Sequence, residues 1–202
     1  MANIGQATFT DAGDVIILCD DEWTCCQREQ AQAKVKEYNK NTPLTITDKV
    51  TEAQKDLKKE CQADACKAMD KEMGQDQDAA ADKFATSPCL AEQLKEPGAS
   101  RSSLNLEMDH PVEVKVGGPE TTALKALDKK INNFMGNAFA RNTGNNMLDE
   151  NHDTVESVSL VCKPPCKPPR KGDEKKPYNA GKKRSYPKSP DPSRVSPKRA
   201  VA

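Results

Sequence analysis

Residues 103–137 read SLNLEMDHPVEVKVGGPETTALKALDKKINNFMGN, and the prediction of fold and function starts from this segment. Apolar and polar side chains alternate from Leu104 to Asp109, which is the period of a half-buried strand. Pro111 biases His110 away from a helical backbone, so we expect the strand to end at the Asp109–His110 pair. Consecutive side chains of a regular strand point to opposite faces. Both can therefore serve one site only if the strand ends between them.

The second half of the segment predicts a short return element and a helix. Gly117-Gly118-Pro119 breaks the chain, and Asp128 can cap a helix that carries Asn132 and Asn133 in its first turn. This arrangement combines one imidazole, one carboxylate and one amide. An imidazole can take a proton from water near neutral pH, and a hard divalent cation prefers carboxylate and amide oxygens. The sequence therefore predicts a metal-dependent phosphodiesterase site.

The spacing of these residues resembles a known family. The run Asp109-His110-x-x-Glu113-hydrophobic-x-x-Gly-Gly, then Leu-Asp-x-x-x-Asn132-x-x-x-Gly, is similar to the HNH (His-Me finger) nucleases, above all to their toxin-type branch. The resemblance implies that His110 is the general base and that Asp109 and Asn132 are metal ligands. It covers about a fifth of the chain. At one position the chain departs from the family, because Ala123 stands where many members carry an asparagine.

The resemblance also implies a biological role. Domains of this branch often form the C-terminal toxin of polymorphic and type VI secretion effectors. The resemblance thus implies an endonuclease toxin that acts on nucleic acid in the cytoplasm of a target bacterium. DNA is the favoured substrate. A cognate immunity protein and a secretion carrier or spike protein are the implied partners, with export from the producer's cytoplasm by a non-Sec route. Mg²⁺ is the expected metal, with Mn²⁺ or Zn²⁺ as alternatives.

Further side chains in and after the segment fit phosphodiester chemistry. Glu113 could orient His110 through the second ring nitrogen, as carboxylates commonly do, or it could be an ordinary loop acid. Basic side chains close by in sequence are expected to contact the nucleic-acid backbone. They are Lys125, Lys129, Lys130 and Arg141.

The predicted fold class is α+β, with a mainly helical N-terminal part, a small ββα-metal finger and a disordered basic Pro-rich tail. The expected division is a lead-in over residues 1–22, which could end a carrier domain, a helical Cys-containing subdomain over 23–99, the finger over 100–162 and the tail over 163–202. Hydrophobic periodicity and caps predict helices over residues 23–39, 47–74, 76–85 and 87–95, and strands over 15–18 and 155–161.

Charge is unevenly distributed along a chain whose net charge is zero. Residues 163–202 hold 13 Lys and Arg against 3 Asp and Glu, and the other residues hold 18 against 28. A basic tail can bind phosphates or can simply be solvated chain. The alternative function is thus a non-enzymatic module that binds nucleic acid or a partner through its tail. A third candidate function, a secretion adaptor with a degenerate finger, rests on Ala123 alone.

No apolar run is long enough for a membrane span, and no Sec-type signal is visible.

The cysteines form an even set, which favours disulfides in an oxidising compartment and small buried side chains in a reducing one. We expect disulfides, and a bond from Cys25 or Cys26 to the second helix would clamp the helical subdomain. The pair Cys162 and Cys166 could form half of a zinc site or enter disulfides, and both alternatives stay open. The full set is Cys19, Cys25, Cys26, Cys61, Cys66, Cys89, Cys162 and Cys166.

Overall fold

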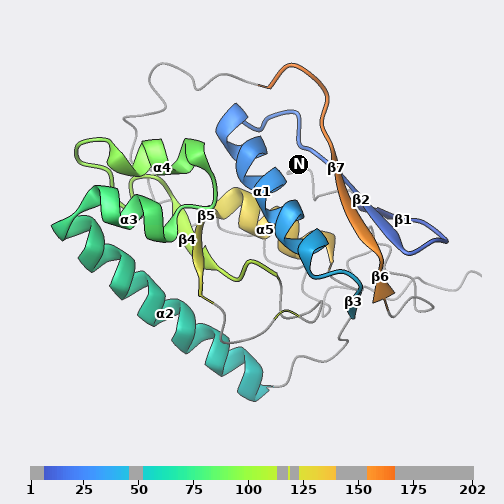
Figure 1. Cartoon of the computed structure of the whole chain (residues 1–202), viewed down its shortest axis with the longest axis horizontal. Coiled ribbons are helices and arrows are strands. Elements are labelled where there is room, and N and C mark those ends of the chain that lie inside the picture. Colours follow the sequence, from blue (N-terminus) through green and yellow to red (C-terminus); the bar gives the residue numbers. More distant parts are fainter. Residues whose placement is uncertain (1–6, 46–51, 113–117, 119–122, 140–153, 167–202) are drawn as a thin grey trace, which may run out of the picture.

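The computed structural model describes residues 7–45, 52–112, 118, 123–139 and 154–166 (Figure 1). The predicted α+β class is confirmed, whereas Glu113, Arg141 and residues 167–202 of the expected tail lie outside the described residues. Residues 163–166, expected in the disordered tail, are described, and Cys166 bonds Cys25. In the part that is described, no helix is both long and apolar enough to cross a membrane. The elements are β1 (Ala7–Phe9), β2 (Asp14–Leu18), α1 (Cys25–Lys40), β3 (Leu44–Thr45), α2 (Glu52–Gln75), α3 (Gln77–Phe84), α4 (Pro88–Lys95), β4 (Leu106–Asp109), β5 (Lys125–Asp128), α5 (Lys129–Ala138), β6 (Thr154–Val155) and β7 (Ser157–Val161).

The helices begin where the sequence supplies capping side chains. Thr24 and Gln27 form a capping box at the start of α1: the Thr24 hydroxyl accepts from the Gln27 N–H at 3.2 Å, and Gln27 Oε1 accepts from the Thr24 N–H at 3.0 Å. Asp76 and Ser87 cap α3 and α4 through their side chains. Local chemistry thus sets these helix starts. The start of α4 at Ser87-Pro88 is as predicted, whereas α1 begins two residues after the expected Trp23. Thr47, the expected start of the second helix, lies outside the described residues.

Replacing Thr24 with alanine is expected to lower the free energy of unfolding by about 1 kcal/mol, because an N-terminal N–H of α1 loses its acceptor. Chemical denaturation measures this loss. Thr45→Ala is the matched control, since Thr45 is an exposed threonine in a two-residue strand and caps no helix. Equal losses in the two variants would contradict the capping role.

A three-stranded sheet joins the two ends of the described chain. Its order is β1-β2-β7, with β1 antiparallel to β2 and β2 parallel to β7. The buried side chains of Val15, Ile17 and Val158 face α1, and Asn39 on α1 bonds both the carbonyl and the N–H of Val158 at 2.8 Å. Residues 7–18, expected in a separate lead-in, therefore share one core with the strand near residue 160.

Two hydrophobic clusters lie on opposite faces of the antiparallel β4–β5 pair. Leu127 belongs to the cluster of α1, α5 and the three-stranded sheet. Met108 and Ala126 belong to the cluster of α2, α3 and α4. The clusters do not follow the expected division near residue 99, because α1 packs with the strands and β4–β5 serves both cores (Figure 1).

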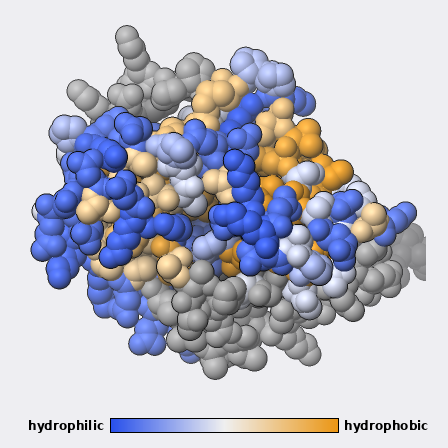
Figure 2. All heavy atoms as spheres, viewed as in Figure 1, coloured by the Kyte–Doolittle hydropathy of each residue, from blue (hydrophilic) through white to orange (hydrophobic). Residues whose placement is uncertain are grey.

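The outer surface differs between the two halves of the molecule. Figure 2 shows hydrophilic surface over α2 and α3 and an apolar patch over β2 and β7, where Leu18 and Val161 are exposed neighbours. In the part of α2 whose side chains are described, Met69 is buried and Ala65, Cys66 and Met73 pack against its cluster, whereas Ala68 is exposed.

The turn before β4 is fixed to α2 and to α5. Arg101 donates from two guanidinium nitrogens to the two carboxylate oxygens of Asp70, both at 3.1 Å, and this hydrogen bonding raises the pKa of Arg101 above its ordinary value. Asn105 adopts a left-handed backbone with φ of 53°, and its carbonyl accepts from the Lys129 N–H at 3.0 Å. These contacts set where β4 begins relative to both helices.

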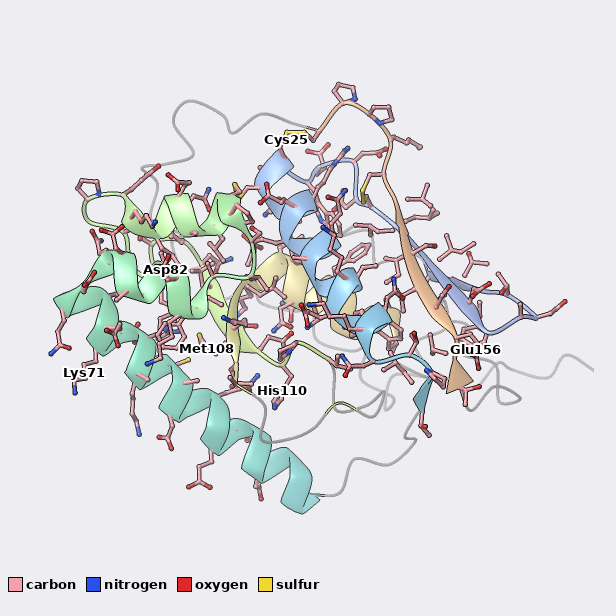
Figure 3. All side chains as sticks on the ribbon, viewed as in Figure 1. Cys25, Lys71, Asp82, Met108, His110 and Glu156 are labelled. Carbon is pink, nitrogen blue, oxygen red and sulfur yellow. A yellow bond between two sulfur atoms is a disulfide. The ribbon has the colours of Figure 1, made fainter. Side chains whose placement is uncertain are left out.

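Three disulfides join the end of β2 and the start of α1 to distant segments (Figure 3). The expected clamp from α1 to the second helix is wrong, because α1 lies beside the end of β7 and beside α4 instead. Cys162 and Cys166 enter two different disulfides, with Cα–Cα distances of 4.9 and 5.0 Å, so they do not form half of a zinc site. Cys66 is a free thiol. The bonded pairs are Cys19–Cys162, Cys25–Cys166 and Cys26–Cys89.

Candidate functional site

The β4 strand ends between Asp109 and His110, as the sequence predicts. His110 is therefore outside the strand and is not forced to the opposite face. Both residues are almost fully buried, at 2% and 1% exposed, and both line one cavity of about 160 Å³. Figure 3 shows His110 beyond the end of β4, far from Cys25 at the start of α1. A carboxylate and an imidazole thus share a single cavity.

A lysine that the sequence analysis did not select completes this buried pair. Lys34 extends from α1, is 2% exposed, and forms an ion pair with Oδ2 of Asp109. Its ammonium also donates to the main-chain oxygen of His110 at 3.2 Å and lies 5.9 Å from the ring centroid of Tyr38. One ammonium therefore fixes the side chain of Asp109 and the backbone of His110 together.

The remaining polar lining of the cavity comes from three elements. Glu37 is on α1 one turn after Lys34, and Thr86 lies between α3 and α4. Lys125, one of the expected backbone-contacting residues, is opposite Asp109 in the β4–β5 register and also lines the cavity. Its ammonium donates to the Lys83 carbonyl at 2.6 Å. A phosphate group at this cavity would meet cationic groups from two directions.

Asn132 is placed beside a different carboxylate from the expected one. Its amide nitrogen donates to Oε2 of Glu107 at 3.0 Å, and Lys129 forms an ion pair with Oε1 of the same carboxylate at 2.9 Å. Glu107 lies two residues before Asp109, so both side chains project from one face of β4, about 7 Å apart along the strand. The structure pairs Asn132 with Glu107 on the face that also carries Asp109.

The helix that carries Asn132 starts as predicted. Oδ1 of Asp128 accepts from the Lys130 N–H at 2.8 Å and from the Ile131 N–H at 3.4 Å, which caps α5. The Lys130 ammonium lies 3.6 Å from Asp20, and Ala123 is exposed before β5 begins. The expected residues Lys129 and Lys130 are thus at the start of α5, in ion pairs with acids of the chain.

One observation tests whether these residues fit a divalent cation. Oδ1 of Asp109 is buried and has no hydrogen-bond partner within the described residues, so one carboxylate oxygen is available as a ligand. Its other oxygen already contacts the ammonium of Lys34. Among the described residues no three His, Cys, Asp or Glu side chains group closely enough to hold a metal. The fit to a cation therefore rests on Asp109.

Sequence patterns could have found part of what was missed. Glu107 is two residues from Asp109 in an alternating strand, so strand periodicity alone places the two carboxylates on one face. Lys34 gives no such signal, because it lies 75 residues from Asp109 in a helix that is rich in charged side chains.

Comparison of the chain with protein-family models, with curated proteins and with solved structures finds no match.

Proposed function

We propose that this chain is a metal-dependent endonuclease that hydrolyses the phosphodiester bonds of nucleic acid, with DNA as the favoured substrate and His110 as the general base. The observation that carries the proposal is the end of β4 at Asp109, which leaves Asp109 and His110 on one cavity. The β4–β5–α5 order also supports it, because an antiparallel pair leads directly into a helix that bears Asn132. This is the order of elements expected for a ββα-metal finger.

The chemistry follows from the groups around the cavity. The free oxygen of Asp109 would hold Mg²⁺ or Mn²⁺, which would supply positive charge to the phosphate and stabilise the leaving oxygen. Asn132, the second ligand that the resemblance implies, would first have to leave Glu107. The His110 imidazole would take a proton from the attacking water. Lys125 lines the same cavity and would help to orient the phosphodiester backbone. Burial of the site would strengthen each of these electrostatic contacts by excluding water.

The proposal extends to an antagonism toxin through the family resemblance. An immunity protein that covers the cavity and a secretion carrier are then the proposed partners. Disulfides form and persist mainly in oxidising surroundings, so the three pairs of this chain support a protein that functions or travels outside the producer's cytosol.

Plasmid cleavage by the purified protein tests this function. We expect nicking with Mg²⁺ or Mn²⁺ that stops in EDTA, and a loss of about 10²- to 10⁴-fold in rate for His110→Ala, the range typical of a general base. His152→Ala is the matched control, because the chain has only two histidines. His110 is buried, so thermal unfolding must first show that His110→Ala is folded.

Two outcomes would contradict the proposal. Full cleavage by folded His110→Ala would exclude His110 as the base. Absence of cleavage by the folded wild-type protein with any of the tested divalent cations, on double- and single-stranded DNA and on RNA, would exclude the nuclease itself.

A further inference from the structure

We propose that the Cys25–Cys166 disulfide is a reduction site of the folded protein, which a dithiol reductant opens before either of the other two disulfides. Reduction there frees Cys166, and the chain that follows it, from the start of α1. The inference concerns the thiol chemistry of the chain and does not depend on the nuclease proposal.

The first step is access to the bond. A hollow of about 350 Å³ lies at the start of α1, where Figure 3 labels Cys25, and both Cys25 and Cys166 line it. Among the other bonded cysteines, all of which the structure describes, Cys162 alone also lines this hollow. Its partner Cys19 packs instead against the cluster of α1, α5 and the three-stranded sheet. Cys25–Cys166 is therefore the disulfide with both cysteines at the open surface of the hollow.

The second step is the surroundings of the Cys26–Cys89 bond, which oppose attack. The sulfur of Cys26 lies 3.5 Å from Oε1 of Gln93 and 3.7 Å from Nε2 of Gln30. The Cys89 N–H donates to a carboxylate oxygen of Glu29 at 2.9 Å, so a negative charge lies beside this bond. That charge repels an incoming thiolate and disfavours the thiolate that would be left behind. Both cysteines are in the first turns of helices, so access and charge, rather than the helix dipoles, separate this bond from Cys25–Cys166.

The third step is the leaving group. Cys25 is the first residue of α1, where N–H groups without an intrahelical acceptor and the helix dipole stabilise a thiolate. Arg28 lies one turn later, lines the same hollow and donates to the Lys163 carbonyl, so its guanidinium is held beside the segment that carries Cys166. Glu29 lines the hollow as well, but it is engaged by a main-chain N–H at the start of α4. Cys25 is therefore the better leaving thiolate of the pair.

The reaction follows from this arrangement. A thiolate of the reductant attacks Sγ of Cys166, the bond from Cys166 to Cys25 breaks, and its electron pair leaves with Cys25 as a thiolate. The second thiolate of the reductant attacks the reductant's own sulfur in the mixed disulfide, which closes the reductant's disulfide and releases Cys166. The protein disulfide gains the two electrons that the reductant loses. The two protons of the reductant's thiols pass through solvent to Cys25 and Cys166.

The fold is expected to survive this reduction. Cys19–Cys162 remains and closes nearly the same loop, since the two bonds join residues 143 and 141 positions apart. The β7 strand, which ends before Cys162, keeps its pairing with β2 from Ser157 to Val161. Reduction of Cys25–Cys166 therefore releases the chain from Cys166 onward and leaves the core in place.

Timed reduction of the full chain by dithiothreitol tests the proposal. Thiols that are free beforehand are blocked with iodoacetamide, and thiols formed after short exposures are labelled with N-ethylmaleimide and located by peptide mass spectrometry. We expect labelling of Cys25 and Cys166 about tenfold faster than that of the other bonded cysteines, because access and a stabilised leaving thiolate both accelerate exchange. Circular dichroism should be unchanged at the stage where this pair alone is labelled.

Glutathione tests the direction of attack. It is a monothiol, so quenching with N-ethylmaleimide after a short exposure should trap the mixed disulfide before it is resolved. We expect glutathione on Cys166 and the maleimide on Cys25, because Cys25 is the leaving thiolate.

A variant tests the contribution of the guanidinium. Arg28→Met should slow the reduction of Cys25–Cys166 about threefold, because the leaving thiolate loses a neighbouring cation. Lys36→Met is the matched control, since Lys36 is exposed on the same helix, and it should leave the rate unchanged. Arg28 is 8% exposed, so thermal unfolding must first show that Arg28→Met is folded. Where it is not, the order of labelling in the wild-type protein decides the proposal.

Each result decides the proposal. Labelling of either of the other disulfides before or together with Cys25 and Cys166 would overturn it, as would loss of the circular dichroism signal at that stage. Glutathione on Cys25, or an unchanged rate in folded Arg28→Met, would overturn the assignment of the leaving group. None of these measurements involves cleavage, so the nuclease proposal is judged separately by its dependence on His110.

Discussion

Removing both the Cys19–Cys162 and the Cys25–Cys166 disulfides should destabilise the protein by about 2 kcal/mol more than the sum of the two separate removals. We expect a loss of about 3 kcal/mol for Cys25→Ala/Cys166→Ala, about 3 kcal/mol for Cys19→Ala/Cys162→Ala, and about 8 kcal/mol for the variant that lacks both bonds.

The reason is that the two bonds close nearly the same loop. They join residues 143 and 141 positions apart, and either bond alone restricts the unfolded chain by about 5 kcal/mol in the chain-entropy treatment. Once one bond is present, the other closes a loop of only about ten residues, because six separate Cys19 from Cys25 and four separate Cys162 from Cys166. A loop of that length contributes about 3 kcal/mol. Each bond thus protects against loss of the other.

Guanidinium unfolding of the three variants measures these differences. Cys66→Ala is the matched control, because Cys66 is a free cysteine outside the bonded pairs. A loss of about 8 kcal/mol is comparable with the whole stability of many domains, so circular dichroism must report whether the variant without both bonds still folds. Strictly additive losses would contradict the shared-loop explanation, and a loss below about 1 kcal/mol for the joint removal would show that these bonds do not constrain the unfolded chain.

Lys34→Met and Asp109→Leu are each expected to lower the free energy of unfolding by about 3–5 kcal/mol, because each leaves the other charge buried without its counter-ion. Lys34 and Asp109 are both 2% exposed, so bulk solvent does not take the place of the missing partner. The double variant Lys34→Met/Asp109→Leu should recover most of the loss, because two apolar side chains of similar length remain.

A double-mutant cycle at low concentrations of divalent cations, by chemical denaturation, measures this coupling. The exposed pair Lys59 and Asp56 on α2 supplies the comparison, since its nitrogen–oxygen distance is 3.2 Å and both side chains are more than 70% exposed. That pair should couple by about 0.5 kcal/mol or less. Coupling of the same small size for Lys34 and Asp109 would show that water reaches the buried pair.

Features that depend on neighbouring residues were predictable from the sequence. The end of β4 at Asp109, the capping of α5 by Asp128 and the starts of α3 and α4 all follow from alternation, from proline or from a capping side chain within four residues. The α+β class follows as well, because it depends only on the order of such elements. For the site, the sequence identified Asp109 and His110 and the helix that carries Asn132.

Contacts between distant residues were not predictable in this way. Lys34 meets Asp109 across 75 positions, Asn132 bonds Glu107 rather than Asp109, and Cys19 bonds Cys162 across 143 positions. Each contact depends on which faces of α1, β4 and β7 meet after packing. A local pattern shows that a side chain is apolar, charged or able to cap, but the partner is set by the packing of elements far apart in the chain. For that reason the buried ammonium beside His110 is visible only in the folded protein.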